Sequence, residues 1–134
     1  LMADLFLEII TPERQFYIGP AEELVIPAID GLYGVQPGHE PAVTAMEPGE
    51  LRYKVDGEWH IAAIGQGFVE IMPERAIVLV STAEKPEEID AKRAQEAKER
   101  AEERMRQKKS VEEYYRSKAA LARAMARLKV SGRR

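Results

Sequence analysis

Four arginines in the last third of the chain have the spacing needed to bind a polyanion. Arg93 and Arg100 are two helical turns apart, and Arg123 and Arg127 are four residues apart, so each pair lies on one side of a helix. A helical hairpin could bring all four to one polyphosphate, because a guanidinium offers parallel N–H donors to phosphate oxygens. The same run also fits a solvated basic face, which is the usual meaning of such a pattern.

Asp90, three residues before Arg93, has two candidate roles. A carboxylate near the start of a helix can cap free backbone amides. It can also accept a hydrogen bond from the ribose or base of a nucleotide, with Ala94 leaving room for the ligand on the same face. The residues alone favour the cap, and both roles stay open at this point.

The side chains needed for catalysis form no recognisable set. His39 and His60 lack the partners of a metal site or a nucleophilic triad. The chain has no cysteine, no glycine-rich phosphate loop and no signalled pair of catalytic carboxylates. We therefore predict no catalytic residue, no metal site and no prosthetic group, which disfavours a nucleotide-handling enzyme.

The charge of the chain divides sharply near Lys85-Pro86. Residues 1–85 hold 5 Lys and Arg against 14 Asp and Glu, a net charge of −9. Residues 86–134 hold 15 against 9, a net charge of +6. A basic segment attached to an acidic one predicts two roles in one chain and an acidic partner for the basic segment.

No apolar run approaches the ~20 residues that span a bilayer, and the first residues lack the pattern of a signal peptide. The sequence thus predicts a soluble, intracellular chain with no direct membrane insertion.

The first 85 residues are typical of a β domain. Short alternating apolar runs recur every 8–12 residues with turn residues between them, which indicates a sandwich or a small barrel. Asp56-Gly57-Glu58 is a strong hairpin signal. Pro27 is expected to stop the strand before it, and Trp59 and Phe68 are expected in the core. The runs expected as strands are Leu5–Ile10, Gln15–Ile18, Leu24–Ile26, Leu51–Val55, Trp59–Ile64, Phe68–Met72 and Ala76–Val80.

Residues 86–134 are typical of two antiparallel helices. Glu87–Lys108 contains neither Gly nor Pro and is rich in strong helix formers. Ser110 and Glu113 have the spacing of a capping box, which predicts a second helix over Val111–Val130.

The expected apolar faces of the two helices are thin. They comprise Ile89, Ala94, Ala97, Ala101 and Met105 on the first helix, and Val111, Tyr114, Tyr115, Ala122, Met125 and Leu128 on the second, with Leu121 adjacent. Alanine gains little on burial, so the seam allows close packing but supplies little energy to hold it. Such a hairpin is a plausible moving part.

Several motifs, in this order and spacing, resemble those of one family. They are Thr11-Pro12-Glu13-Arg14, Gly34-Val35-Gln36-Pro37-Gly38-His39-Glu40-Pro41, Glu47-Pro48-Gly49-Glu50-Leu51, Gly67-Phe68-Val69-Glu70, Thr82-Ala83-Glu84 and Ile89-Asp90-Ala91-Lys92-Arg93-Ala94. With the order of a β domain and a helical hairpin, they make essentially the whole chain resemble the epsilon subunit of bacterial F-type ATP synthases, which is similar to the mitochondrial delta subunit.

The resemblance implies a β + α fold, with a ten-stranded β-sandwich over 1–85 and a regulatory two-helix antiparallel hairpin over 86–134. It implies a non-catalytic subunit of the central stalk in a proton- or sodium-translocating ATP synthase. The implied partners are the gamma subunit and the membrane c-subunit ring. The complex would sit at the cytoplasmic face of the bacterial cell membrane, with this chain peripheral to the membrane.

The resemblance also implies that the hairpin moves. The basic helices would extend toward the alpha and beta subunits and inhibit ATP hydrolysis, whereas ATP, with or without magnesium, would bind the compact hairpin as a regulator. The implied nucleotide-binding residues are Glu84, Ile89, Asp90, Arg93, Ala94, Arg100, Arg123 and Arg127. The implied gamma interface is Gly38, His39, Glu40 and Pro41, and fold position alone suggests Glu23 and Asp30–Tyr33 for the membrane ring.

A nucleic-acid-binding module is the alternative function. The positive charge of the helical segment favours it. The acidic β domain, the regular spacing of Glu among the basic residues and the lack of interleaved aromatic residues count against it.

Overall fold

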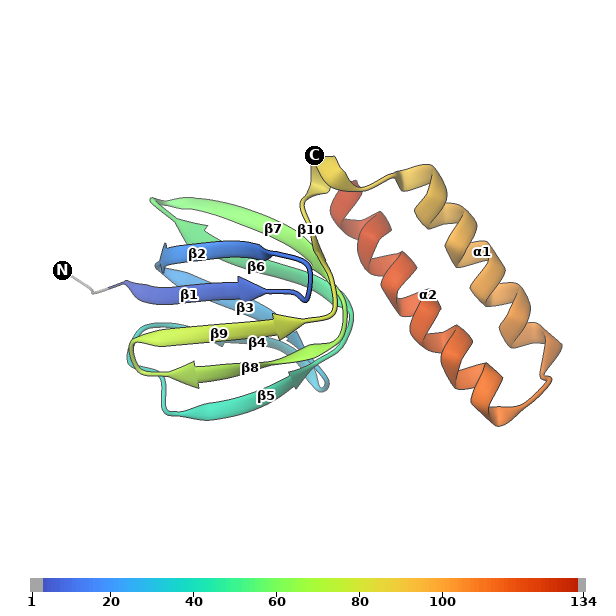
Figure 1. The fold of residues 1–134 in the computed structure, drawn as a ribbon, viewed down its shortest axis with the longest axis horizontal. Coiled ribbons are helices and arrows are strands. Elements are labelled where there is room, and N and C mark those ends of the chain that lie inside the picture. Colours follow the sequence, from blue (N-terminus) through green and yellow to red (C-terminus); the bar gives the residue numbers. More distant parts are fainter. Residues whose placement is uncertain (1–3, 133–134) are drawn as a thin grey trace.

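The computed structural model describes residues 4–132, which form ten strands followed by two helices (Figure 1). The strands are β1 (Leu5–Ile10), β2 (Gln15–Ala21), β3 (Glu23–Ala28), β4 (Gly31–Val35), β5 (Ala42–Met46), β6 (Gly49–Val55), β7 (Glu58–Ile64), β8 (Gly67–Met72), β9 (Arg75–Val80) and β10 (Ala83–Glu84). A 3-10 helix at Pro86–Glu88 leads to α1 (Ala91–Gln107) and α2 (Val111–Ser131). The expected β + α class, a ten-stranded sandwich followed by a helical hairpin, is confirmed.

The strands are joined in the order β10-β7-β6-β3-β5-β8-β9-β1-β2, with β4 paired to β3. Neighbours are antiparallel except for β1 and β9, which are parallel. Only the pair Ala28–Met46 joins β3 to β5. The sheet turns there, so that β5, β8, β9, β1 and β2 form one layer and the remaining strands form the other (Figure 1).

Side-chain alternation places the core between the two layers. Leu5, Leu7 and Ile9 in β1 are fully buried, whereas Phe6 points outward. The same period of two is clear in β3, β8 and β9. The largest buried side chains of the sandwich are Leu5, Leu7, Ile9, Leu24, Ile26, Val35, Leu51, Val69, Ile71 and Val78.

Two aspects of the strand prediction are wrong. β3 continues through Pro27, which was expected to end it. Because the pairing of β3 with β6 stops at Val25, the missing N–H of Pro27 costs no hydrogen bond on the β6 side. The strands β4 and β5 lie in and after the Gly/Pro-rich stretch, where no alternating run signalled them. The predicted hairpin at Asp56-Gly57 is confirmed, because both residues have the positive φ that its turn requires (50° and 79°).

Trp59 and Phe68 were predicted as core residues, and this is also wrong. They are 45% and 47% exposed, respectively. Phe68 pairs with Leu79 on the outer face of its layer, and the next residue, Val69, points into the core. Trp59 lies on the outside of β7, where the charged ends of Arg52 and Lys54 lie 5.9 and 5.8 Å from its ring centroid.

The helices begin and end at clear signals. The first helix begins later than the run from Glu87 predicted. A 3-10 turn and extended Ile89 precede α1, and Asp90 caps it. Lys108 adopts a left-handed conformation and ends α1. Ser110 Oγ then accepts from the Glu113 N–H at 3.0 Å, which is the serine half of the predicted capping box.

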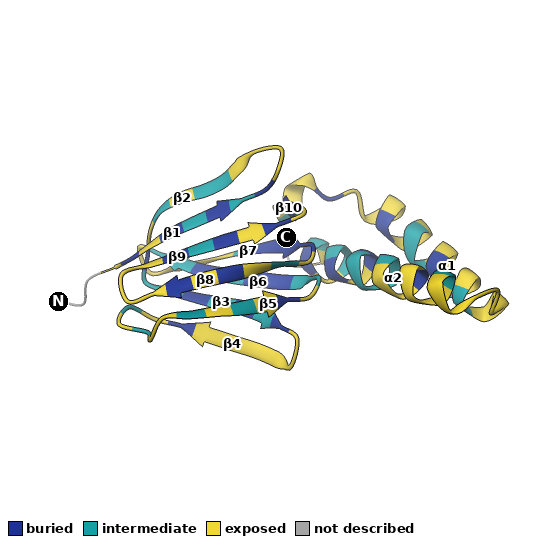
Figure 2. Ribbon diagram, turned by 60° about the horizontal axis from the view of Figure 1, so that its bottom comes forward, coloured by how far each residue is buried: buried dark blue, intermediate teal, exposed yellow. Residues whose placement is uncertain are grey.

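The apolar face expected for α2 is largely on the outside (Figure 2). Val111, Tyr115 and Met125 are 74%, 61% and 52% exposed. The buried positions are instead Ser117, Ala124, Ala126 and Val130. Small residues at the seam, with Ala94 and Ala101 on α1, let the helices pack closely, so the larger side chains are left outside.

The hairpin touches the sandwich through α2, which packs against β6 and β7 (Figure 1). The contact has its own small apolar cluster of Ala63, Ile89 and Val130, with Ile61 packed against it. This cluster is separate from the large core of the sandwich. The hairpin, called the arm below, is therefore attached by few apolar side chains.

Candidate functional site

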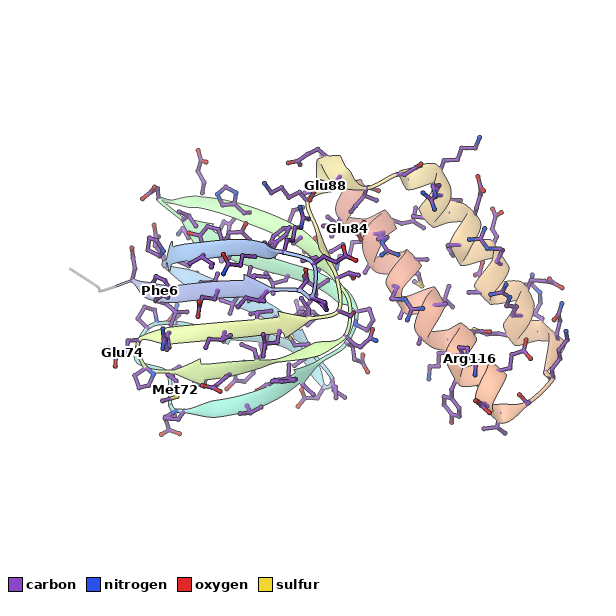
Figure 3. The ribbon with its side chains drawn as sticks, viewed as in Figure 1. Phe6, Met72, Glu74, Glu84, Glu88 and Arg116 are labelled. Atoms are coloured by element: carbon purple, nitrogen blue, oxygen red, sulfur yellow. The ribbon has the colours of Figure 1, made fainter. Side chains whose placement is uncertain are left out.

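A cleft of about 390 Å³ lies where the arm joins the sandwich. Figure 3 shows Glu84 and Glu88 at this junction. The cleft is lined by Glu84, Glu88, Asp90, Arg93, Ala94, Ala97, Arg100 and Arg127. Residues from β10, the linker and both helices thus meet at one place.

Six of the eight predicted nucleotide-binding residues line this cleft. Arg123 lines a smaller adjoining hollow, together with Glu84 and Arg127. Ile89 is 3% exposed and packs in the apolar cluster with Ala63 and Val130, so its role in the structure is to anchor the linker.

Asp90 acts as the N-cap of α1. Its Oδ1 accepts from the Arg93 N–H at 3.1 Å, while its backbone is extended. The capping role left open by the sequence is therefore confirmed. The cap also fixes the first turn of α1 and with it the backbone of Arg93.

Arg127 already has an anionic partner in the cleft. Its Nε donates to Glu84 Oε1 at 2.6 Å, and both side chains are about one-third exposed (31% and 28%). This bond joins the end of the last strand to α2. An anionic ligand would have to share Arg127 with Glu84 or displace it.

Arg93 and Arg100 are the available cations of the cleft. Both are exposed, and neither makes an ion pair within the described part of the chain. Ala94 and Ala97 line the same wall without filling it. Two free guanidiniums beside a small apolar wall suit a ligand with a phosphate group and a flat apolar part.

Arg14 is a site residue that the sequence reasoning missed. Its Nη1 and Nη2 each donate to Glu88 at 2.9 Å, and Nη2 also donates to the Ala83 carbonyl at 2.8 Å. The Arg14 guanidinium, helped by the Lys85 N–H, lowers the pKa of Glu88 from its usual 4.5 to about 2. Arg14 belongs to the Thr11–Arg14 motif, but no local pattern indicated that its partner is Glu88, 74 positions further along the chain.

The predicted gamma interface is an ordered loop. His39 Nε2 lies 2.8 Å from the Tyr33 hydroxyl, and its Nδ1 lies 2.6 Å from the Glu40 carbonyl. The Gly38 N–H donates to the Pro73 carbonyl at 2.7 Å, which ties the loop to the turn between β8 and β9. Gly38, Glu40 and Pro41 are exposed.

The outer face of the layer beside this loop carries several large apolar side chains. Its partly exposed side chains come from four adjacent strands and are called the outer patch: Phe6, Val43, Phe68, Met72 and Leu79. They range from 37% to 70% exposed. Figure 3 labels Phe6 and Met72, at the end of the sandwich away from the arm. Charged residues share this face: Glu70 lies between Phe68 and Met72 on β8, and Arg75 is paired with both Met72 and Phe6. A face with this many exposed large apolar side chains is a candidate interaction surface.

Within residues 4–132, no group of three or more His, Cys, Asp or Glu is placed to hold a metal ion. None of the described helices is long and apolar enough to cross a membrane.

The fold is similar to chains in two solved mitochondrial complexes. One, from Euglena gracilis ATP synthase (OSCP/F1/c-ring), has a TM-score of 0.83 at 23% identity and covers 96% of this chain and 81% of that one. The other, from the central stalk/c-ring of Tetrahymena thermophila ATP synthase, has a TM-score of 0.70 at 12% identity and covers 96% of both chains. At these identities the likeness concerns the fold.

Sequence comparison gives the family. The model of the ATP synthase delta/epsilon chain beta-sandwich domain matches residues 4–86, and that of the long alpha-helix domain matches residues 87–132. The ATP synthase epsilon chain of Ruminiclostridium cellulolyticum is 50% identical over 133 residues, 99% of each chain. That of Caldanaerobacter subterraneus subsp. tengcongensis is 47% identical over 128 residues, covering 95% of this chain and 93% of the relative. The chain therefore belongs to the bacterial ATP synthase epsilon chains, which are non-catalytic subunits of the F-type ATP synthase.

Proposed function

We propose that this chain is a central-stalk subunit that couples the gamma subunit to the membrane c-subunit ring and inhibits ATP hydrolysis through its arm. The sandwich over 1–85 is the anchor and the hairpin over 86–134 is the regulatory part. ATP, with magnesium if it is carried by the nucleotide, binds the compact arm and favours the non-inhibitory state. In this function the chain sits peripherally at the cytoplasmic face of the bacterial cell membrane.

The outer patch supports the anchoring role. It is continuous with the loop of Gly38, His39, Glu40 and Pro41, because Gly38 is bonded to Pro73 at the end of β8. Large apolar side chains interleaved with Glu70 and Arg75, beside an exposed polar loop, have the mixed composition of a non-obligate protein interface. We assign it to the gamma subunit. The exposed Leu32, within the predicted segment Asp30–Tyr33, and the exposed Ile29, just before it, are available to the c-subunit ring.

The weak attachment of the arm supports the inhibitory role. Within residues 4–132, the buried apolar side chains between the arm and the sandwich form one small cluster around Ala63 and Val130. The exposed apolar side chains of α2, such as Tyr115 and Met125, are available to a second surface. Basic residues on the same helices suit the alpha and beta subunits, if the surfaces they meet are acidic.

The convergence of Glu84, Asp90, Arg93, Ala94, Arg100 and Arg127 on one cleft carries the nucleotide proposal. Its volume lies in the range of small-molecule sites. A nucleotide there would bridge the linker and both helices, so it would hold the arm compact. The nucleic-acid-binding alternative draws no support from the comparisons, and intrahelical pairs such as Arg116–Glu112 neutralise part of the basic surface.

The test of inhibition uses a bacterial catalytic head that lacks this subunit. Full chain or residues 1–88 are added back, and gamma binding and ATP hydrolysis are measured together. We expect both to bind gamma and only the full chain to suppress hydrolysis. If both bind and neither inhibits, the chain is a structural coupler and the inhibitory arm is wrong.

The test of the nucleotide site is calorimetry of ATP binding to the full chain. Arg93→Ala is the informative variant, because Asp90→Ala would also remove the cap of α1. Arg106→Ala is the matched control: it too is an exposed arginine of α1, but it pairs with Glu103 and lies outside the cleft. We expect Arg93→Ala to weaken binding by about tenfold, the effect of losing a charge-assisted bond, and the control to leave it unchanged. If Arg93→Ala and Arg106→Ala bind ATP with equal affinity, the assignment of the nucleotide site to this cleft is wrong.

A further inference from the structure

The contact between Arg14 and Glu88 lies where the arm leaves the sandwich, and the nucleotide proposal does not use it. The two residues are 74 positions apart in the chain. Arg14 belongs to the turn between β1 and β2, and Glu88 ends the 3-10 helix of the linker. The bond is thus a direct tie between the body of the sandwich and the linker.

The turn holds Arg14 in place before any partner is present. Thr11 Oγ1 accepts from the backbone N–H groups of Glu13 and Arg14, at 3.3 and 3.1 Å, and lies 3.2 Å from the Arg14 carbonyl. The guanidinium lies 5.1 Å from the centroid of the Phe16 ring. A fixed backbone and an aromatic neighbour restrict the side chain, so less freedom is lost when it binds.

Arg14 is hydrogen-bonded to both ends of the linker, at Ala83 and at Glu88. It donates to the carbonyl of Ala83 in the last strand and to both carboxylate oxygens of Glu88. Glu88 in turn accepts from the Lys85 N–H at 2.7 Å. These bonds fix the path of the chain from β10 to the start of α1. The linker cannot swing away from the sandwich while they are made.

We propose that Arg14 is a latch: its bonds to Glu88 and Ala83 hold the arm in the compact position, and they must break before the arm moves. The Arg14 and Glu88 side chains are 43% and 35% exposed, so the latch is reversible and sensitive to salt. Glu84–Arg127 and the apolar cluster then form the remaining attachment. This inference rests on the proposed movement of the arm but not on nucleotide binding.

The test measures arm position in the full chain without nucleotide. The chain has no cysteine, so spin labels at Glu58→Cys in the sandwich and Lys129→Cys in α2 report one distance distribution. Both positions are exposed. The latch variants are Arg14→Gln and Glu88→Gln, and the rescue variant is the reversed pair, Arg14→Glu with Glu88→Arg. Thermal unfolding of each variant checks that the sandwich is intact.

Two controls define the scale. Arg116→Gln breaks an exposed ion pair within α2, with Glu112, far from the junction (Figure 3). Val130→Asp places a charge in the apolar cluster and should open the arm by itself. We expect each latch variant to raise the ratio of separated to compact arm by roughly three- to tenfold, the range for losing a charge-assisted surface pair. The reversed pair should lower the ratio in part, because it restores the ion pair but not the bonds to the Ala83 carbonyl and from the Lys85 N–H, and Arg116→Gln should leave the ratio unchanged.

High salt should shift the wild type toward the latch variants, because it screens the exposed pair. If Val130→Asp opens the arm but neither latch variant does, the arm moves and Arg14 is no latch. If none of the three variants opens the arm, the arm does not move. Both the latch proposal and the proposed inhibition by a moving arm are then wrong.

Discussion

The arginines at the junction differ in whether they are already ion-paired, and the difference sets what a ligand must do there. Arg127 is bonded to Glu84, Arg14 is bonded to Glu88, and Arg93 and Arg100 make no ion pair among the described residues. A phosphate can therefore bind Arg93 and Arg100 without breaking a bond. Binding Arg127 as well would release Glu84, so the protein and the ligand compete for this one guanidinium.

The acid dependence of Glu88 gives a prediction at this scale. Its pKa in the folded chain is about 2, against a usual value of 4.5, because the charged form is bonded to Arg14 and to the Lys85 N–H. A lowered pKa means that the unfolded chain takes up the proton first. The stabilisation by Glu88 is therefore complete above about pH 5 and is lost as the pH falls from 4.5 toward 2.

We accordingly expect the wild type to unfold at a higher temperature than Glu88→Gln at neutral pH, with the difference shrinking steadily below about pH 4.5. Calorimetric melting of the two proteins at several pH values measures this. A difference that stayed constant down to about pH 2 would show that Glu88 does not titrate as an ion-paired carboxylate.

At the scale of elements, the arm depends on a seam of small residues. Ala94 and Ala101 of α1 are seven residues apart and share one face, as do Ser117 and Ala124 of α2. All four are buried, and none fills much volume. The close approach that they allow is also a weakness, since the seam has no space for a larger side chain.

Ala101→Leu should therefore loosen the arm. Ala101 is 2% exposed, and overpacking such a site costs about 1–3 kcal/mol. We expect the helices to separate or to fray, with a lower far-UV helical signal and weaker cross-linking between α1 and α2. The control is Ala119→Leu, the same change at an exposed position of α2. If the two variants behave alike, the seam has room to spare and is not the weak element of the arm.

The sequence predicted the elements better than their faces. Alternation gave β1 and the hairpin at Asp56-Gly57 correctly, because both signals are local. It missed β4, which pairs with the preceding strand β3 but contains the poor strand formers Gly31 and Gly34, and β5, whose pairing with the distant β8 overrides weak local preference. The sequence also predicted the wrong buried face for α2. Small residues line the contact between the helices, so the large apolar side chains of α2 are exposed.

The site was predictable only in part, and for the same reason. The resemblance supplied the residues of the cleft, and the fold brought six of them together. Ile89 was placed in the site because it belongs to the motif, yet its side chain packs against Ala63 and Val130. Arg14 belongs to a quoted motif, but its contact with Glu88 could not be found from the sequence, because the two residues become neighbours only in the folded chain.

At the scale of the whole molecule, the two ends of the sandwich have different surfaces. The arm covers one end with charged groups and a small apolar cluster. The outer patch runs across one layer and reaches the other end at Phe6 and Met72 (Figure 3). The chain can therefore bind a partner through the patch while the arm stays free to move, which is the separation that an anchored regulator requires.

The last prediction tests that separation with two aromatic residues of almost equal exposure. Phe68, 47% exposed, lies in the outer patch, and Trp59, 45% exposed, lies on the other layer beside Arg52 and Lys54. We expect Phe68→Glu to weaken binding to the gamma subunit by at least about tenfold, because a charge would be buried in an apolar interface. Trp59→Glu should leave gamma binding nearly unchanged, and both variants should fold, since neither side chain belongs to the core. Surface plasmon resonance against immobilised gamma measures the affinities. A larger loss for Trp59→Glu would place the anchor on the opposite layer, and the gamma interface would then have to be assigned again from that face.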